Sequence, residues 1–106
     1  MGLFIKMSDE VKMLIDILFD PSARDDERHD AAMDIGKYND ERALKALLQI
    51  GSNPIEDIII LDACGESVAE ILVNRDEFRK DALEKLTPIA KKTAYAFIKE
   101  HKPQWR

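Results

Sequence analysis

Three carboxylates recur at every fourth position in the second half of the chain: Asp62, Glu66 and Glu70. If this segment is helical, the spacing places the three side chains in one row along the helix. Like charges at this spacing destabilise a helix by about 0.2–0.5 kcal/mol per pair, so the row does not help the helix to form. Such a row can receive arginine and lysine side chains of a partner. The alternative is that the acids face solvent or pair with cations of an adjacent helix, such as Arg42 or Lys45.

A second group of acids lies in an earlier predicted helix, residues 25–38. The cluster Asp25-Asp26-Glu27 stands at its beginning, where the helix dipole attracts negative charge for structural reasons alone. Asp30 and Asp34 lie further along, on the polar side of the same helix. We therefore expect an acidic surface in which Asp30 and Asp34 assist the row on the later helix.

The sequence offers little that could carry out catalysis. Cys64 is a nucleophile only if a neighbouring base lowers its pKa, and its place among apolar residues predicts packing instead. His29 and His101 are the only imidazoles, and no spacing suits zinc. Gly65-Glu66-Ser67 falls inside a predicted helix and cannot form a phosphate-binding loop. We expect no enzymatic activity, no cofactor and no metal.

Length and charge limit the class of protein. A chain of 106 residues corresponds to one domain, and 45% apolar residues suffice for a core. The net charge of −5 argues against nucleic-acid binding, which needs clustered lysine and arginine. It fits a basic protein partner, although many cytosolic domains are this acidic merely to stay in solution.

The N-terminal region and the single cysteine bear on the compartment. One cysteine forms no internal disulfide, and no apolar run is long enough to span a membrane. Residues 1–7 carry only one charge, Lys6, and contain no apolar stretch long enough for a signal peptide, and Met7 is an alternative start. We expect a soluble cytoplasmic protein without membrane contact, whose oligomeric state the sequence leaves open.

Helix signals run from end to end, so the predicted fold class is all-α. Ser8 is a candidate N-cap for a first helix over residues 8–20, which Asp20-Pro21 ends. After the helix over residues 25–38, Asp40 is positioned to cap a third helix that ends near Gly51.

The longest predicted helix spans residues 55–73. A broad apolar arc, wider than the usual stripe, predicts a central helix packed on more than one side. Its members are Ile58, Ile60, Leu61, Cys64, Val68, Ile71 and Leu72. A fifth helix carries Phe78, Ala82, Leu83 and Leu86, and Thr87-Pro88 opens a last helix over residues 88–101. Trp105 lies beyond it and can either anchor a partner or fold back to cap the last helices.

A short sequence motif of the first half of the chain is repeated in the second half. Ala31–Gly36 is echoed by Ile60–Gly65, with the two glycines in register. A period between about 20 and 50 residues combined with helical patterning is typical of stacked helical hairpins. Proteins of this architecture usually bind other macromolecules, which the echo therefore favours here.

The better copy resembles the short HEAT-like repeat of phycobilisome-lyase-type proteins. An arginine precedes paired alanines, Ile-Gly follows, and after an Asn-Asp turn an Ala-Leu pair opens the next helix. The matching residues are Arg28, Ala31, Ala32, Ile35, Gly36, Asn39, Asp40, Ala43 and Leu44. The second copy is degraded, since Asp57 stands where Arg28 stood and the helix continues past Gly65.

The resemblance implies a HEAT-like stack of about three helical hairpins. The single domain, residues 1–106, would then comprise the first helix (8–20), the best repeat (25–51), the degraded repeat (55–86) and the last helix (88–101). Some small acidic bacterial proteins of this type are immunity proteins that block a toxin domain, and others are adaptors or assembly subunits. Lyase relatives bind a pigment, but no lyase residues match here.

These expectations give two functional hypotheses. The leading one is an immunity protein that covers the basic active site of a toxin, such as the nucleic-acid groove of a nuclease, through Asp62, Glu66 and Glu70 with Asp30 and Asp34. The alternative is an adaptor or assembly subunit of another bacterial complex.

Overall fold

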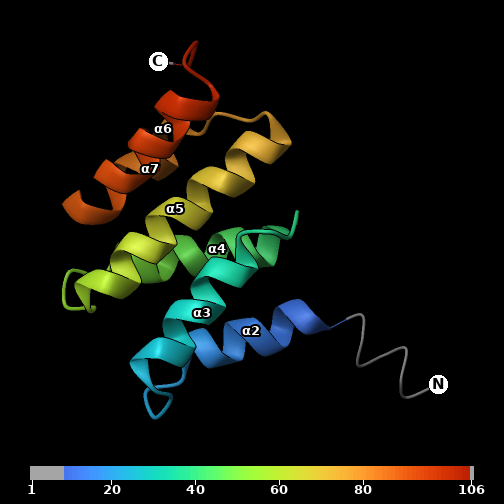
Figure 1. The fold of residues 1–106 in the computed structure, drawn as a ribbon, viewed down its shortest axis with the longest axis vertical. Helices are drawn as coiled ribbons and strands as arrows, with labels where there is room; N and C mark the ends of the chain where they lie inside the picture. Colours follow the sequence, from blue (N-terminus) through green and yellow to red (C-terminus); the bar gives the residue numbers. More distant parts are fainter. Residues whose placement is uncertain (1–8, 106) are drawn as a thin grey trace.

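The computed structural model describes residues 9–105, and these form six α-helices and no strand (Figure 1). The predicted all-α class is therefore confirmed for the described chain. The helices are α2 (Glu10–Phe19), α3 (Asp25–Ile35), α4 (Glu41–Gly51), α5 (Ile58–Arg75), α6 (Lys80–Glu84) and α7 (Pro88–His101). The proposed cap Ser8 lies outside the described residues.

Two predicted helix starts are confirmed by their caps. The Asp40 side chain accepts a hydrogen bond from the backbone N–H of Arg42 at 2.8 Å, which satisfies a donor that a helix start leaves free. The Thr87 hydroxyl accepts one from Ala90 N–H, and Pro88 occupies the first turn of α7.

Other predicted boundaries were wrong. α3 ends at Ile35 and does not reach Tyr38, because the chain tightens there into turns. α5 begins at Ile58, since the Asp57 carboxylate accepts the N–H of Ile59 at 2.8 Å and caps the helix. The fifth helix is a short segment, Lys80–Glu84, that leaves Phe78 outside it.

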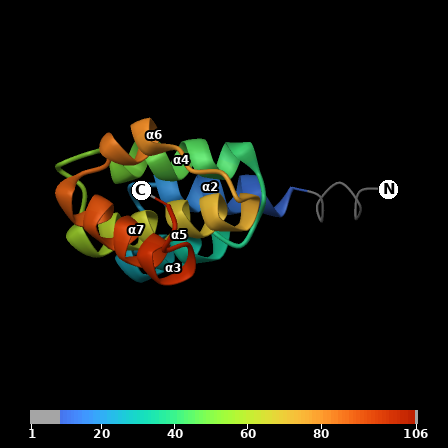
Figure 2. The same cartoon turned by 90° about the horizontal axis from the view of Figure 1, so that it is seen from above.

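The helices form two layers (Figure 2). α2, α4 and α6 lie on one side, and α3, α5 and α7 lie on the other. α5 packs most closely against α7 and also against α4 and α3, which confirms the prediction of a central helix packed on more than one side. α3 packs mainly on α2 and α5, so the closest pairs of consecutive helices are α2–α3 and α4–α5.

The two glycines of the repeated motif have the same role in packing. A Cβ added at Gly36 would lie 2.7 Å from the Ser67 hydroxyl, which is buried and donates to the Ala32 carbonyl at 2.6 Å. A Cβ added at Gly65 would lie 2.8 Å from the backbone carbonyl carbon of Ala90. Gly36 therefore lets α3 approach α5, and Gly65 lets α5 approach α7.

A half-buried ion pair connects three parts of the chain. Arg28 on α3 donates to both oxygens of Glu56 at 2.7 and 2.9 Å, and its Nε donates to the Leu18 carbonyl at the end of α2 at 2.9 Å. Both charged side chains are only 13% exposed. Paired in this way, Arg28 fixes the loop before α5 against the junction of α2 and α3.

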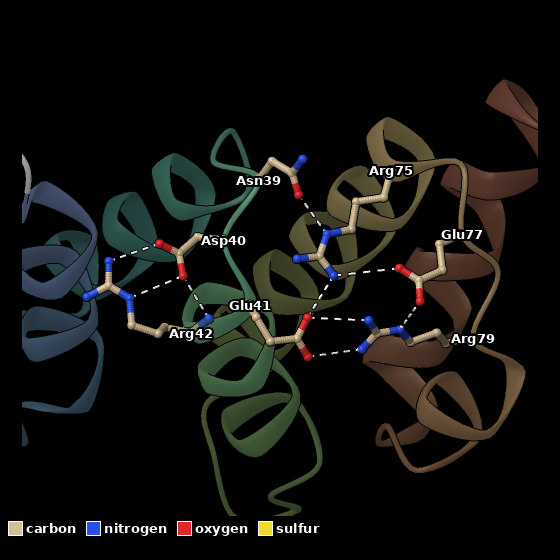
Figure 3. A network of polar contacts seen from close by, with 7 residues as sticks. All are labelled: Asn39, Asp40, Glu41, Arg42, Arg75, Glu77 and Arg79. Carbon is tan, nitrogen blue, oxygen red and sulfur yellow. Dashed lines mark hydrogen bonds and ion pairs between the residues drawn. The ribbon is translucent and has the colours of Figure 1, made fainter.

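A more exposed network joins α4 to the end of α5 and the start of α6 (Figure 3). Glu41 accepts from Arg75 at 2.7 Å and from Arg79 at 3.2 and 3.3 Å. Glu77 accepts from Arg79 at 2.9 Å, and Asn39 accepts from Arg75 at 2.7 Å. Single surface pairs contribute little, but several shared charges hold these segments in register.

The C-terminal segment folds back, one of the two predicted roles of Trp105. Its ring lies 5.3 Å from that of Phe78, and Lys102 Nζ lies 5.9 Å from the centre of the Trp105 ring. Lys102 also pairs with Asp76 at 2.9 Å. The segment after α7 therefore covers the junction between α5 and α6.

We predict that Gly65→Ala destabilises the fold by about 1–3 kcal/mol, because the new methyl group meets backbone atoms of Ala90 on α7 and not the end of a flexible side chain. Urea denaturation monitored by circular dichroism measures this. Gly51→Ala is the matched control, since its methyl group meets side-chain atoms and no backbone, namely the tip of Leu86 at 2.9 Å and Cys64 Cβ at 3.4 Å. Equal losses in the two variants would contradict the close approach of α5 and α7.

We predict that the free energy of unfolding decreases as the pH falls below about 4.5. Hydrogen bonds from Arg79 and Arg75 lower the pKa of Glu41 from 4.5 to about 2, and the hydrogen bond with Arg28 lowers the pKa of Glu56. Stabilisation from a carboxyl with a lowered folded-state pKa is complete above its unfolded pKa and disappears as pH falls through the folded value.

Urea titrations from about pH 7 to about pH 2 test this linkage. Glu56→Gln should lower stability at neutral pH and flatten the acid-dependent slope. Asp81→Asn, an exposed change on α6, should alter neither. A slope that Glu56→Gln leaves unchanged would show that Glu56 does not contribute to it.

Candidate protein-binding surface

The acidic row lies on the one side of α5 that no other helix covers. Between Ile60 and Leu72 every residue of α5 is buried except Asp62, Glu66 and Glu70. Asp62 is exposed, whereas Glu66 and Glu70 are half-buried. α3, α4 and α7 thus enclose this stretch of the helix and leave the row as its only solvent-facing strip between Ile60 and Leu72.

The row is not neutralised by the cations of the neighbouring helix. Asp62 accepts a hydrogen bond from the Thr93 hydroxyl of α7. Arg42 pairs instead with Asp40 at 2.9 Å and with Asp9 at 3.3 Å. Among residues 9–105 no salt bridge reaches the row.

Asp34 lies near the end of α3 and lines a hollow with Glu10, Leu14, Lys37 and Tyr38. It pairs with Lys37 at 3.3 Å, and Lys37 is close enough to Glu70 to act on its titration. A Cβ at Gly36 would lie 3.0 Å from a Glu70 carboxylate oxygen, which shows how closely α3 and the row meet. The structure therefore relates Asp34 to Glu70 only through Lys37.

Asp30 lies one turn before Asp34 on α3 and is further from the row. Its side chain is 79% exposed, and its carboxylate lies 3.6 Å from His29 Nδ1. It extends the acidic surface along α3 but does not contact the three acids of α5.

The surroundings of Glu70 disfavour the negative charge of its carboxylate. Burial is the main cause that raises the pKa of its carboxyl above 4.5, and the charge of Glu66 adds to it. Lys37 and His101 oppose this rise. A cation placed beside Glu66 and Glu70 would therefore stabilise the ionised form of both.

α7 contributes a hollow beside the row that the sequence did not indicate. Its volume is about 400 Å³, and it is lined by Glu66, Thr93, Ala96, Phe97, Glu100 and His101. The rings of Phe97 and His101 stack at 4.0 Å. Glu100 could not be assigned to this surface beforehand, because the alignment of α7 against α5 depends on the contact at Gly65.

The other chemical candidates do not form a site. Cys64 is fully buried, as predicted, and burial raises the pKa of its thiol from 9.0 to about 12. Across the described chain, no three His, Cys, Asp or Glu residues come together as metal ligands. Nor does any described helix have the length and apolarity needed to cross a membrane.

No protein-family model matches the sequence, and comparisons with curated proteins and with solved structures likewise find no match. The resemblance to HEAT-like repeats therefore depends on the matching residues between Arg28 and Leu44. The evidence for a function is the surface of the protein itself.

We predict that Cys64 reacts slowly with a thiol reagent such as DTNB in the native protein and rapidly in urea. Its side chain is enclosed by the core, and the thiolate is scarce at neutral pH. The absorbance of the thionitrobenzoate that the reagent releases measures both rates. Rapid labelling of the native protein would contradict a packing role for this residue.

Proposed function

We propose that this protein is a binding module that holds a basic partner protein on the acidic face formed by Asp62, Glu66, Glu70, Asp30 and Asp34. One observation carries the proposal: the only uncovered strip of α5 between Ile60 and Leu72 is entirely acidic, although a buried central helix gains nothing from such a row.

The energetics of the row favour a cationic partner. Glu66 and Glu70 repel each other, and partial burial already disfavours the charge on Glu70. Lysine or arginine side chains of a partner would relieve both effects. Complementary charge also accelerates association, since the surface attracts the partner before contact. The net charge of −5 makes nucleic acid an unsuitable ligand.

We further propose that the helices form a HEAT-like stack of about three hairpins. The two layers, with α3, α5 and α7 side by side, support this arrangement. The equivalent roles of Gly36 and Gly65 in the packing of successive helices support it as well.

In its most specific form the proposal is a cytoplasmic bacterial immunity protein. The acidic face would occlude the basic active site of a toxin by bulk and by charge. Adaptor or assembly function in another bacterial complex is the second candidate, which the same acidic face supports, because such a face can hold a basic partner without blocking an active site.

The test begins with affinity capture from the native host and identification of the captured partner. We predict that Glu66→Gln combined with Glu70→Gln weakens binding of that partner about tenfold, mainly through slower association. The amides preserve shape and remove charge. Surface plasmon resonance at two salt concentrations measures rates and affinity.

Asp16→Asn combined with Asp81→Asn is the matched control, because it removes the same charge from exposed positions on α2 and α6. If both double variants bind like the native protein, the acidic face is not the binding site. Co-expression separates the two candidates: an immunity protein restores growth to cells that produce the partner, whereas an adaptor leaves their growth unchanged.

A further inference from the structure

Three isoleucines at the start of α5 are exposed to solvent. Ile55 is 89% exposed, Ile58 is 62% exposed and Ile59 is 61% exposed. The prediction that Ile58 belongs to the buried arc was wrong, because the helix begins only at this residue and the neighbouring helices cover it from Ile60 onward. Clustered exposed apolar side chains of this kind mark binding surfaces. We call Ile55, Ile58 and Ile59 the isoleucine patch.

The patch is continuous with the acidic row. Ile58 lies one turn before Asp62, so the strip of α5 reads Ile58, Asp62, Glu66, Glu70 at four-residue spacing. From Ile58 to Glu70 the strip extends about 18 Å, or about three helical turns.

α7 follows the strip on one side. Its Thr93 donates to Asp62, and its Phe97 and His101 line the hollow at Glu66. α5 and α7 run in the same direction in Figure 1. Ile89, which is 39% exposed, lies one turn before Thr93 and therefore at the level of Ile58.

The other side of the patch has an acidic border. A hollow of about 300 Å³ is lined by Asp25, Asp26, His29, Asp57 and Ile59. Asp26 pairs with Arg24 at 3.1 Å, and the Asp57 carboxylate accepts the Ile59 N–H. An apolar surface with such a border suits an apolar side chain that basic residues flank. It disfavours a second copy of this chain, because two acidic borders would meet.

We propose that the isoleucine patch anchors an amphipathic helix of the basic partner, which lies along the strip between α5 and α7. Its apolar side chains cover Ile58 and Ile59, and lysines or arginines at four-residue spacing face Asp62, Glu66 and Glu70. The exposed strip beside the parallel helices α5 and α7, with its hollow at Glu66, gives a helix a surface to lie along, and the charge spacing matches one turn of helix per acid. This inference depends on the proposed function and adds the form of the partner element.

The probe is a synthetic helical peptide of about 15 residues with two leucines at one end and three lysines at four-residue spacing after them. A second peptide carries the leucines at the opposite end, because the direction of the bound helix is open. Matched peptides replace the leucines by serine or the lysines by glutamate. Fluorescence anisotropy measures affinity, and amide chemical shifts in NMR locate the contact.

We predict that one leucine–lysine peptide binds and that both matched substitutions weaken it. Ile58→Ser combined with Ile59→Ser should reduce its affinity about tenfold or more, because the leucines lose their apolar contact. Met13→Ser is the matched control, since Met13 is 59% exposed but lies on α2. All three substitutions are at exposed positions, and circular dichroism verifies that the variants fold.

Three results would overturn the inference. The first is that neither leucine–lysine peptide binds the native protein. The second is that the Ile58→Ser, Ile59→Ser variant binds the peptide as well as the native protein does. The third is that sedimentation shows a dimer that this variant abolishes. The proposed function fails separately, when the captured partner binds the Glu66→Gln, Glu70→Gln variant with native affinity.

Discussion

Enclosure of α5 on three sides is the constraint on which the rest of the structure depends. α3, α4 and α7 all pack on this helix, so its residues between Ile60 and Leu72 are buried except along one strip. The charged residues of this stretch lie only there, whereas the buried Ser67 hydroxyl is satisfied by the Ala32 carbonyl. The same enclosure makes Cys64 inaccessible and leaves Asp62, Glu66 and Glu70 as the surface of the helix.

Close approach of backbones makes this enclosure possible. Gly36 and Gly65 lie where a methyl group would meet the neighbouring helix. Both copies of the repeated motif therefore allow two helices to approach closely. Arg28 and Glu56 then fix the loop that leads into α5. Because that loop ends at the Asp57 cap, α5 starts beyond the cover of its neighbours, and Ile58 and Ile59 remain in solvent.

The exposed strip of α5 therefore combines an apolar surface with an acidic one. Its apolar beginning results from where the helix starts, and its acidic continuation results from where the helix is enclosed. Apolar contact supplies affinity that surface charge alone does not, whereas charge supplies direction and speed of association. A partner that matches both along about three turns would be selected over one that matches either alone.

The sequence by itself determined the helical class, the caps at Asp40 and Thr87, the burial of Cys64 and the single row of acids. These depend on periodicity and on contacts within a few residues, which a sequence displays directly. Only the tertiary structure decided that Glu56 pairs with Arg28, that Ile58 is exposed, and that Glu100 borders the row. Each of these depends on which helix faces which, and at what level, and that is set by packing between residues far apart in the chain.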